Sequence, residues 1–345
     1  MPSRAVGIDI GTRTITVAEV REARGGATVT NFGGVELAPD TVRDGEVLDA
    51  IGAAGALKEL LASTKITEKR VWLGVANARV VVRQIDLPWM PEDELRSSIR
   101  YQVQEHIPIP VEDAELDMYV VADWHTEDGD HLQRVLLVAA HREMLATHIE
   151  VATRAGLKPV GVDLNAFASL RAVGSTSPLE SGHEVLVDVG AGVTTILVHG
   201  AGAPSFARIL SAGGDALTHD LANALGVEHD EAEKLKREAI VGGDTEVDRV
   251  LTASVDRYVD EIRSSLDYFR AQPGAERLSG MVLTGGSAGL HGVVDRMAAN
   301  LRLPVALGNP FEQWRCAKTV YDADQLAAVG PTLATAVGLA LGGLE

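Results

Sequence analysis

The hydrophobic pattern of the chain repeats once, half a chain apart. The stretch VGIDIGTRTITVAEV, which begins at Val6, aligns without gaps on LVDVGAGVTTILVHG, which begins at Leu186, when Asp9 is placed on Asp188. Each copy reads as strand, turn and strand, and each is followed by a third candidate strand, ATVTNFGGVEL or APSFARILSAG. Two similar β-meanders at matching places predict two lobes of similar topology that face each other.

Helical spacing follows each meander. In the first half, apolar residues recur at this spacing at Val47, Leu48, Ile51, Ala54, Leu57 and Leu61. In the second half, AGGDALTHDLANALG predicts one helix, and DEAEKLKRE, in which Asp230 and Glu233 fit an acidic variant of a capping box, predicts the next. A long apolar stripe then predicts a helix from about Thr245 to Ala271, stopped by the QPG that follows.

The block over 77–160 has a different pattern. VVVRQIDL reads as a strand, PEDELRSSIRYQVQEH as a helix, ELDMYVVADW and QRVLLVAAH as two strands, and EMLATHIEVATRAG as a second helix. We therefore predict an α/β fold in which this β-α-β-β-α unit is an inserted interaction subdomain. The first lobe comprises residues 1–76 and 161–184, and the second comprises 185–345, with the C-terminal helix a candidate to return to the first lobe.

Composition and charge narrow the class of protein. The chain has 345 residues, of which 46% are hydrophobic and 23% charged, as in soluble globular proteins. Its net charge of −18 disfavours binding to nucleic acid and direct docking on anionic lipid. The single cysteine, Cys316, allows no intrachain disulfide and fits a reducing compartment. No stretch reaches the roughly 20 apolar residues of a membrane span. These features predict a soluble cytoplasmic protein.

Three Gly-rich turns carry the candidate chemistry. They are DIGTRT from Asp9, DVGAGVTT from Asp188 and TGGSAG from Thr284, and the last opens a predicted helix. Glycines let backbone N–H groups approach phosphate oxygens, threonine hydroxyls add donors, and a helix N-terminus favours anions. Two facing aspartates can hold the waters around a Mg²⁺ ion that bridges phosphates. The three turns together predict a phosphate site between the lobes.

The order of these turns resembles the actin, hexokinase and Hsp70 ATPase superfamily, which has a bilobal, ribonuclease-H-like fold. Within it, the chain resembles the PilM family of actin-like proteins of type IV pilus assembly from end to end. The likeness includes GIDIGT, QIDLPWMPEDELRSSIRYQVQEHIPIP, SAGGDALTHDLANALG with DEAEKLKRE, TGGSAGLHG and LGNPF. The segment in the insertion is the most specific of these, because the phosphate turns alone indicate only the superfamily.

The resemblance implies that ATP and Mg²⁺ bind in the central cleft. Asp9 and Asp188 would lie in the outer shell of the metal. The residues implied at the nucleotide are Gly11, Thr12, Arg13, Thr14, Gly190, Ala191, Gly192, Thr194, Gly213, Gly214, Asp215, Glu233, Lys236, Gly285, Gly286 and Ser287. For Arg13, neutralising the γ-phosphate and pointing to solvent are equal alternatives. A solvated surface pair is the alternative for Glu233 and Lys236, and Asp215 is also a candidate helix N-cap.

Hydrolysis of ATP is a weaker expectation than binding. Hydrolytic relatives have a Glu or Gln in the segment that joins the lobes, where it orients the attacking water. The corresponding segment here, PVGVDLNAFASLRA, offers Asp163 and Asn165 instead. Asp163 is the one catalytic candidate, and a helix-starting cap is its alternative role. We therefore expect slow turnover or none.

The resemblance also implies a protein partner, the short cytoplasmic N-terminal peptide of a PilN-like membrane protein. The implied groove lies between the insertion and the first lobe. Its candidate lining is Arg83, Leu87, Ile99, Val103, Ile107 and Pro108. Ile99 and Val103 also lie on the stripe that this helix would bury in its own core.

Two other functions compete with this scaffold. One is a small-molecule kinase of the same superfamily, in which Asp163 or Asp215 would activate a substrate hydroxyl. The other is an actin-like cell-division protein, which would need a basic amphipathic C-terminal helix where this sequence reads ALGGLE. Recruitment to the inner face of the plasma membrane through a pilus inner-membrane complex is therefore favoured over a direct membrane anchor. Self-association stays an open alternative.

Overall fold

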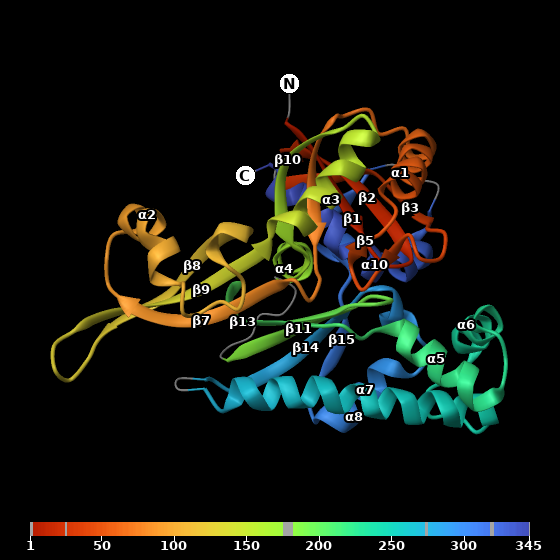
Figure 1. Cartoon of the computed structure of the whole chain (residues 1–345). Coiled ribbons are helices and arrows are strands. Elements are labelled where there is room, and N and C mark those ends of the chain that lie inside the picture. Colours follow the sequence, from red (N-terminus) through yellow and green to blue (C-terminus); the bar gives the residue numbers. More distant parts are fainter. Residues whose placement is uncertain (1–2, 25, 175–181, 273–274, 318–320, 345) are drawn as a thin grey trace.

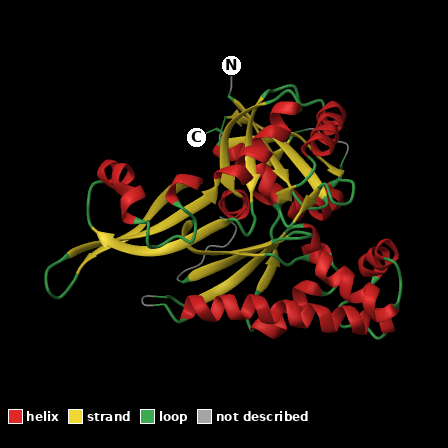
Figure 2. Ribbon diagram, viewed as in Figure 1, coloured by secondary structure: helices red, strands yellow, loops and turns green. Residues whose placement is uncertain are grey.

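The computed structural model describes residues 3–24, 26–174, 182–272, 275–317 and 321–344. Within them, two large sheets and two layers of helices outside the sheets enclose a central helical layer (Figures 1 and 2). A smaller three-stranded sheet projects from the side of this body.

The first lobe is built on a six-stranded sheet. Its strand order is β10 (Lys158–Leu164), β6 (Arg70–Val75), β1 (Arg4–Ile10), β2 (Thr14–Ala23), β3 (Gly26–Glu36) and β16 (Arg315–Cys316). A short ribbon, β4 (Val42–Arg43) with β5 (Glu46–Val47), follows β3. Val6, Ile8 and Val17 point to a buried cluster under α1 (Ala50–Thr64) and α3 (Arg142–Arg154).

The second lobe is built on a five-stranded sheet. Its strand order is β13 (Ala203–Leu210), β12 (Thr194–Gly200), β11 (His183–Val189), β14 (Leu278–Thr284) and β15 (Val305–Leu307). Helices cover its outer face, namely α5 (Gly214–Leu225), α6 (His229–Glu238), α7 (Glu246–Arg270) and α8 (Val293–Leu301). A 3₁₀ turn (Gly286–Gly289) follows β14.

The two sheets share one topology. In each, a meander of three antiparallel strands is extended by two parallel strands on the side of its first strand, β6 and β10 in one lobe and β14 and β15 in the other. The register agrees as well, because Asp9 pairs with Thr16 across β1 and β2 just as Asp188 pairs with Thr195 across β11 and β12. The internal repeat of the sequence is therefore a repeat of structure.

Two helices form the layer between the sheets, α4 (Asn165–Val173) and α10 (Ala323–Gly342), with the short α9 (Pro310–Gln313) beside them. Their apolar faces join side chains of both sheets, such as Val20 and Leu186, in one buried cluster. The close approach depends on Gly338, since a Cβ there would lie 1.7 Å from the carbonyl oxygen of Ala168. α10 is also the described helix that is long and apolar enough to cross a membrane, at a mean hydropathy of 1.4. Here it is a core helix.

The inserted unit consists of β7 (Val80–Pro88), α2 (Glu92–Gln102), β8 (Ala114–His125), β9 (His131–His141) and α3, with a 3₁₀ turn (Val111–Asp113) before β8. Its sheet has the order β7-β9-β8. α2 packs on one face and closes a core of its own around Leu95, Val135 and Leu137. The β8–β9 hairpin points away from both lobes (Figure 1).

Three details differ from the sequence prediction. The first-half helix begins at Ala50 after the N-cap Asp49, so Val47 lies in β5, while Leu48 and Ile51 are exposed. The predicted box of Asp230 and Glu233 does not form, because the N-cap of α6 is Glu228 and Glu233 is bound elsewhere. No apolar stretch of roughly 20 residues was predicted, yet α10 is 20 residues long, because a capping box of Asp322 and Gln325 starts the helix ahead of its buried apolar residues.

Candidate functional site

A cleft of about 430 Å³ lies between the lobes, at the ends of β1 and β11. The first lobe contributes the β1–β2 turn, and the second contributes the β11–β12 turn, the start of α5, one face of α6 and the turn after β14. The floor is formed by α4 and α10, through Asn165, Thr332 and Thr335. All three Gly-rich turns of the sequence therefore meet in one place.

The two related turns have the same backbone geometry. Gly11 donates its N–H to the carbonyl of Thr14 at 2.9 Å, and Gly190 donates to the carbonyl of Val193 at 3.0 Å. Among the described residues, the N–H groups of Thr12, Arg13, Ala191 and Gly192 find no acceptor. Free N–H groups on opposed turns are what an anion between two lobes requires.

The aspartates at the strand ends are held as a facing pair. Asp9 accepts a hydrogen bond from Asn165 Nδ2 at 2.9 Å, and Asp188 accepts from Thr335 Oγ1 at 2.9 Å and from Ser169 Oγ at 3.3 Å. Burial and then the charge of Asp188 raise the pKa of Asp9 to about 7, although the Asn165 contact opposes the shift. Burial also raises the pKa of Asp188. Within the described part of the chain, no positively charged side chain compensates the pair.

Oxygen atoms without partners lie at the same place. Thr16 Oγ1 and Asn165 Oδ1 are buried and have no hydrogen-bond partner among the described residues, and both residues line the cleft. With the two carboxylates they make a donor set of oxygen alone, which suits a hard cation such as Mg²⁺ rather than a thiophilic metal. The site residues thus fit a cation that neutralises the aspartates.

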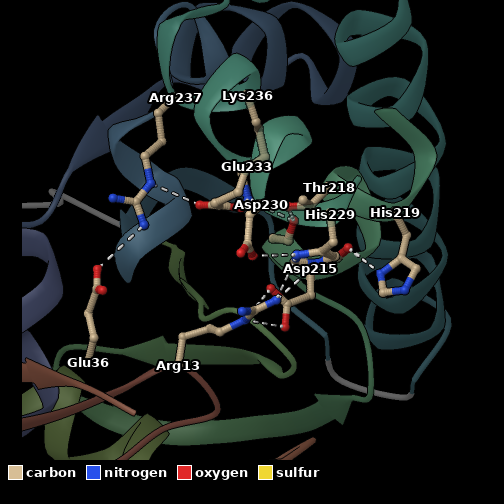
Figure 3. Close-up of polar contacts among 11 residues, drawn as sticks. Arg13, Glu36, Asp215, Thr218, His219, His229, Asp230, Glu233, Lys236 and Arg237 are labelled. Atoms are coloured by element: carbon tan, nitrogen blue, oxygen red, sulfur yellow. Dashed lines mark hydrogen bonds and ion pairs between the residues drawn. The ribbon is translucent and has the colours of Figure 1, made fainter. Parts of the chain in front are cut away.

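Arg13 connects the lobes instead of pointing to solvent (Figure 3). Its Nε lies 3.1 Å from both carboxylate oxygens of Asp215, and its terminal nitrogen lies 2.9 Å from His229 Nε2. Asp215 is therefore not the N-cap of α5, a place that Gly213 takes. The first N–H groups of α5, on Gly214 and Asp215, donate to the carbonyls of Gly190 and Ala191. Residues 213–215 thus hold the β11–β12 turn in place through backbone hydrogen bonds.

Glu233 and Lys236 form a cleft wall and not a solvated pair. Lys236 is 5% exposed, and its ammonium donates to the carbonyl of Gly214, to Thr218 Oγ1 and to Glu233 Oε2. Burial lowers the pKa of Lys236 despite these acceptors. Burial also acts on Glu233, but the hydrogen bonds from Lys236, Thr218 and Arg237 outweigh it and lower the pKa of Glu233 to about 2. These hydrogen bonds tie α6 to α5.

The third turn closes the cleft from the side of α8. Gly285 has φ +91°, and a Cβ there would lie 2.4 Å from the carbonyl oxygen of Val189 and 2.5 Å from Asp188 Oδ1. Only glycine fits that contact without strain. Gly286 and Ser287 follow it on the cleft surface.

Four residues predicted at the site are not in the lining of the cleft itself. Gly192 and Gly213 line a neighbouring cavity of about 550 Å³ that shares Thr12, Arg13, Ala191 and Asp215 with the cleft, so they lie at its edge. Thr194 points into the core, where its hydroxyl bonds Ala212 and Tyr258, because it is one residue out of phase with the cleft face of β12. Asp163 is paired with Arg171 at 3.0 Å and is outside the cleft lining.

Other cleft residues were missing from the sequence prediction. Thr16 and Thr195 follow from the repeat, because each pairs with an aspartate across its hairpin. Arg237 lies one position beyond the predicted Lys236 and reaches toward Glu36 of the first lobe at 3.9 Å (Figure 3). Thr332 and Thr335 come from α10, and no local motif marks them.

A sequence profile of the family described as "Type IV pilus assembly protein PilM" matches residues 7–344. The chain belongs to the PilM family. It is accordingly an actin-like scaffold protein of type IV pilus assembly. The cell division protein FtsA of Streptococcus pneumoniae serotype 2 is 25% identical over 334 residues, which cover 84% of this chain and 72% of FtsA. The PilM prediction from sequence is confirmed and is favoured over the cell-division and kinase alternatives.

Solved structures agree with the PilM assignment. The structure described as "PilM-PilN type IV pilus biogenesis complex" superposes with a TM-score of 0.87 at 26% identity, covering 99% of this chain and 98% of that one. MreB5 of Spiroplasma citri bound to ADP superposes with a TM-score of 0.52 at 12% identity, covering 96% and 94%. The predicted bilobal actin-like fold is confirmed, and nucleotide is present in some of the solved proteins that share it.

The residues predicted for the partner groove of this PilM-family chain are mostly core residues. Leu87, Ile99, Val103 and Ile107 are each less than 10% exposed and form the interior of the insertion. Arg83 and Pro108 are exposed. The helical stripe of α2 is thus explained by the insertion's own packing.

Proposed function

We propose that this chain is an ATP- and Mg²⁺-binding scaffold that holds the N-terminal cytoplasmic peptide of a PilN-like membrane protein. This partner would keep it at the inner face of the plasma membrane. The observation that carries the nucleotide proposal is the pair of opposed turns. Each has N–H groups without acceptors and a partly buried aspartate without a cationic partner, among the residues that the structure describes. Mg²⁺ would supply the positive charge that joins these aspartates to the phosphates.

Different residues of the cleft would contact the phosphates, the metal ion and the adenosine. The free N–H groups of Thr12 and Arg13 would hold phosphate oxygens from the first lobe, and those of Ala191 and Gly192 would do so from the second. Asp9 and Asp188, oriented by Asn165 and Thr335, would hold the waters of the metal ion. Gly285, Gly286 and Glu233 would line the adenosine side.

We propose that the chain binds ATP and hydrolyses it slowly or not at all. Asp163, the catalytic candidate, is held by Arg171 outside the cleft. Asp215 is committed to Arg13, and Glu233, with a pKa of about 2, is a poor base. Slow turnover is therefore the expectation for the purified chain.

The peptide is proposed to lie where the insertion meets the first lobe. β10 is an edge strand, paired with β6 alone in the described sheet, and Val160 on it is 37% exposed. An extended peptide could add to such an edge through its backbone. The solved complex of PilM with PilN, so similar to this chain over its whole length, supports a partner of that kind.

Calorimetry tests both halves of the proposal. ATP with Mg²⁺ should bind the wild type, and Gly190→Trp, which fills the second turn, should abolish binding. A synthetic N-terminal peptide of the PilN-like protein from the same genome should bind the wild type and lose at least about tenfold in affinity to Val160→Asp. Ile149→Asp, a matched change at an exposed apolar residue of α3, should not alter it. Absence of peptide binding by the wild type would remove the scaffold proposal.

A further inference from the structure

A second groove, of about 450 Å³, separates the insertion from the second lobe. One wall is β7, from Val82 to Ile85, and the other is formed by β13 and the end of α7, through Phe206, Arg208 and Tyr268. The side chain of Gln84 donates to the carbonyl of Ser205 and joins the two walls. This basic groove, defined by Arg83 and Arg208, is distinct from the nucleotide cleft.

The groove carries two positive charges beside strands that lie against each other. β7 and β13 are the edge strands of their described sheets, and Gln84 of β7 already donates to the carbonyl of Ser205 in β13. Arg83 and Arg208 are exposed, and neither has an ion-pair or hydrogen-bond partner among the described residues. These two guanidinium groups make the groove locally basic in a chain whose net charge is −18.

The same chain carries a complementary acidic tip, the turn over 126–130 of the β8–β9 hairpin. Glu127, Asp128 and Asp130 are exposed there, and the described residues hold no cation against them. The hairpin projects free of the body (Figure 1). A narrow two-stranded projection with three free carboxylates suits an arginine-lined groove between two strand edges.

The acidic tip of one molecule cannot reach the basic groove of the same molecule. The groove lies at Leu136 of β9, and the tip ends just before His131, the first residue of β9, five residues from Leu136. At about 3.3 Å per residue the tip stands roughly 17 Å beyond the groove and points away from it. Any contact between tip and groove is therefore made by two molecules.

We propose that the basic groove of one copy takes the acidic hairpin tip of a second copy. Because tip and groove are different surfaces, the contact is heterologous and repeats head to tail instead of closing as a two-fold dimer. The net charge of −18 repels copies in other orientations, so the paired patches select this one. This inference goes beyond the proposed function and does not depend on it.

Charge reversal with sedimentation velocity over a concentration series tests the contact. The groove variant is Arg83→Glu with Arg208→Glu, and the tip variant is Glu127→Lys with Asp128→Lys. Each alone should weaken assembly at least about tenfold, because attraction becomes repulsion at both charge positions. An equimolar mixture should assemble again, since each variant's tip then matches the other's groove.

A matched control is Arg24→Glu with Arg70→Glu, two exposed arginines without ion-pair partners in the described first lobe. It changes net charge as much as the groove variant and should assemble like the wild type. Failure of the mixture to assemble, or equal weakening by the control, would overturn the proposal. A wild-type protein that stays monomeric at every concentration would also overturn the proposal. The basic groove would then be a candidate binding site for an acidic segment of another protein.

Discussion

Replacing Asp9 with asparagine should stabilise the metal-free protein while removing a residue that the cleft needs. In the folded chain the pKa of Asp9 is raised to about 7, from 3.8, by burial and by Asp188. Asparagine keeps the shape and removes the charge. The buried, uncompensated carboxylate is the physical reason for the expected gain.

The pH dependence follows from the direction of that shift. Below pH 3.8, Asp9 is protonated in both states and adds no pH-dependent difference. Between pH 3.8 and 7 the unfolded chain ionises while the folded chain keeps its proton, so the wild type loses unfolding free energy as pH rises. At 1.36 kcal/mol per pKa unit, the full difference is about 4 kcal/mol above pH 7 and roughly 1.5 kcal/mol at pH 5.

Urea unfolding of the wild type and Asp9→Asn, in EDTA at pH 5, 6, 7 and 8, measures this directly. The advantage of Asp9→Asn should grow over that range and level off above pH 7. A difference that is constant with pH, or a less stable variant at pH 8, would refute the idea that Asp9 is an uncompensated buried acid.

Three further substitutions have expected outcomes. Gly285→Ala places a Cβ 2.4 Å from the Val189 carbonyl at φ +91°, and should cost about 1–3 kcal/mol in urea unfolding and at least about tenfold in ATP affinity by calorimetry. Thr245→Ala removes the capping box of α7 and should cost about 1 kcal/mol without changing ATP affinity. Lys236→Met strips a donor from Glu233 and should cost about 1–3 kcal/mol. Because the lowered pKa of Glu233 stabilises the folded chain above pH 4.5, that loss should shrink as urea titrations approach pH 2.

The elements predicted most accurately from the sequence are those that local sequence signals determine. α7 runs from Glu246 to Arg270, one residue inside the predicted range at each end, because a threonine cap and an apolar stripe mark it. The repeat predicted the two meanders, since a strand-turn-strand pattern around an aspartate is local as well. Such features need no knowledge of distant contacts.

Long-range packing decided the features that the sequence did not predict. Thr335 reaches Asp188 only because α10 lies between the sheets, and Arg13 meets Asp215 only because the lobes face each other. The apolar residues of α2 recur at the same helical spacing whether they bind a partner or pack in a core. Here they pack in the core of the insertion. Thr194 lies one position from Thr195 along β12, and because alternate side chains point to opposite faces, it points into the core and not into the cleft.

The most direct test of the central claim compares the ATP affinity of the wild type, Asp188→Asn and Asp163→Asn by calorimetry, with and without Mg²⁺. The cleft account predicts Mg²⁺-dependent binding to the wild type, equal binding to Asp163→Asn, and at least about a tenfold loss in Asp188→Asn, because Asp188 lines the cleft and Asp163 does not. Equal affinity in all three proteins, or no binding to the wild type, would contradict it.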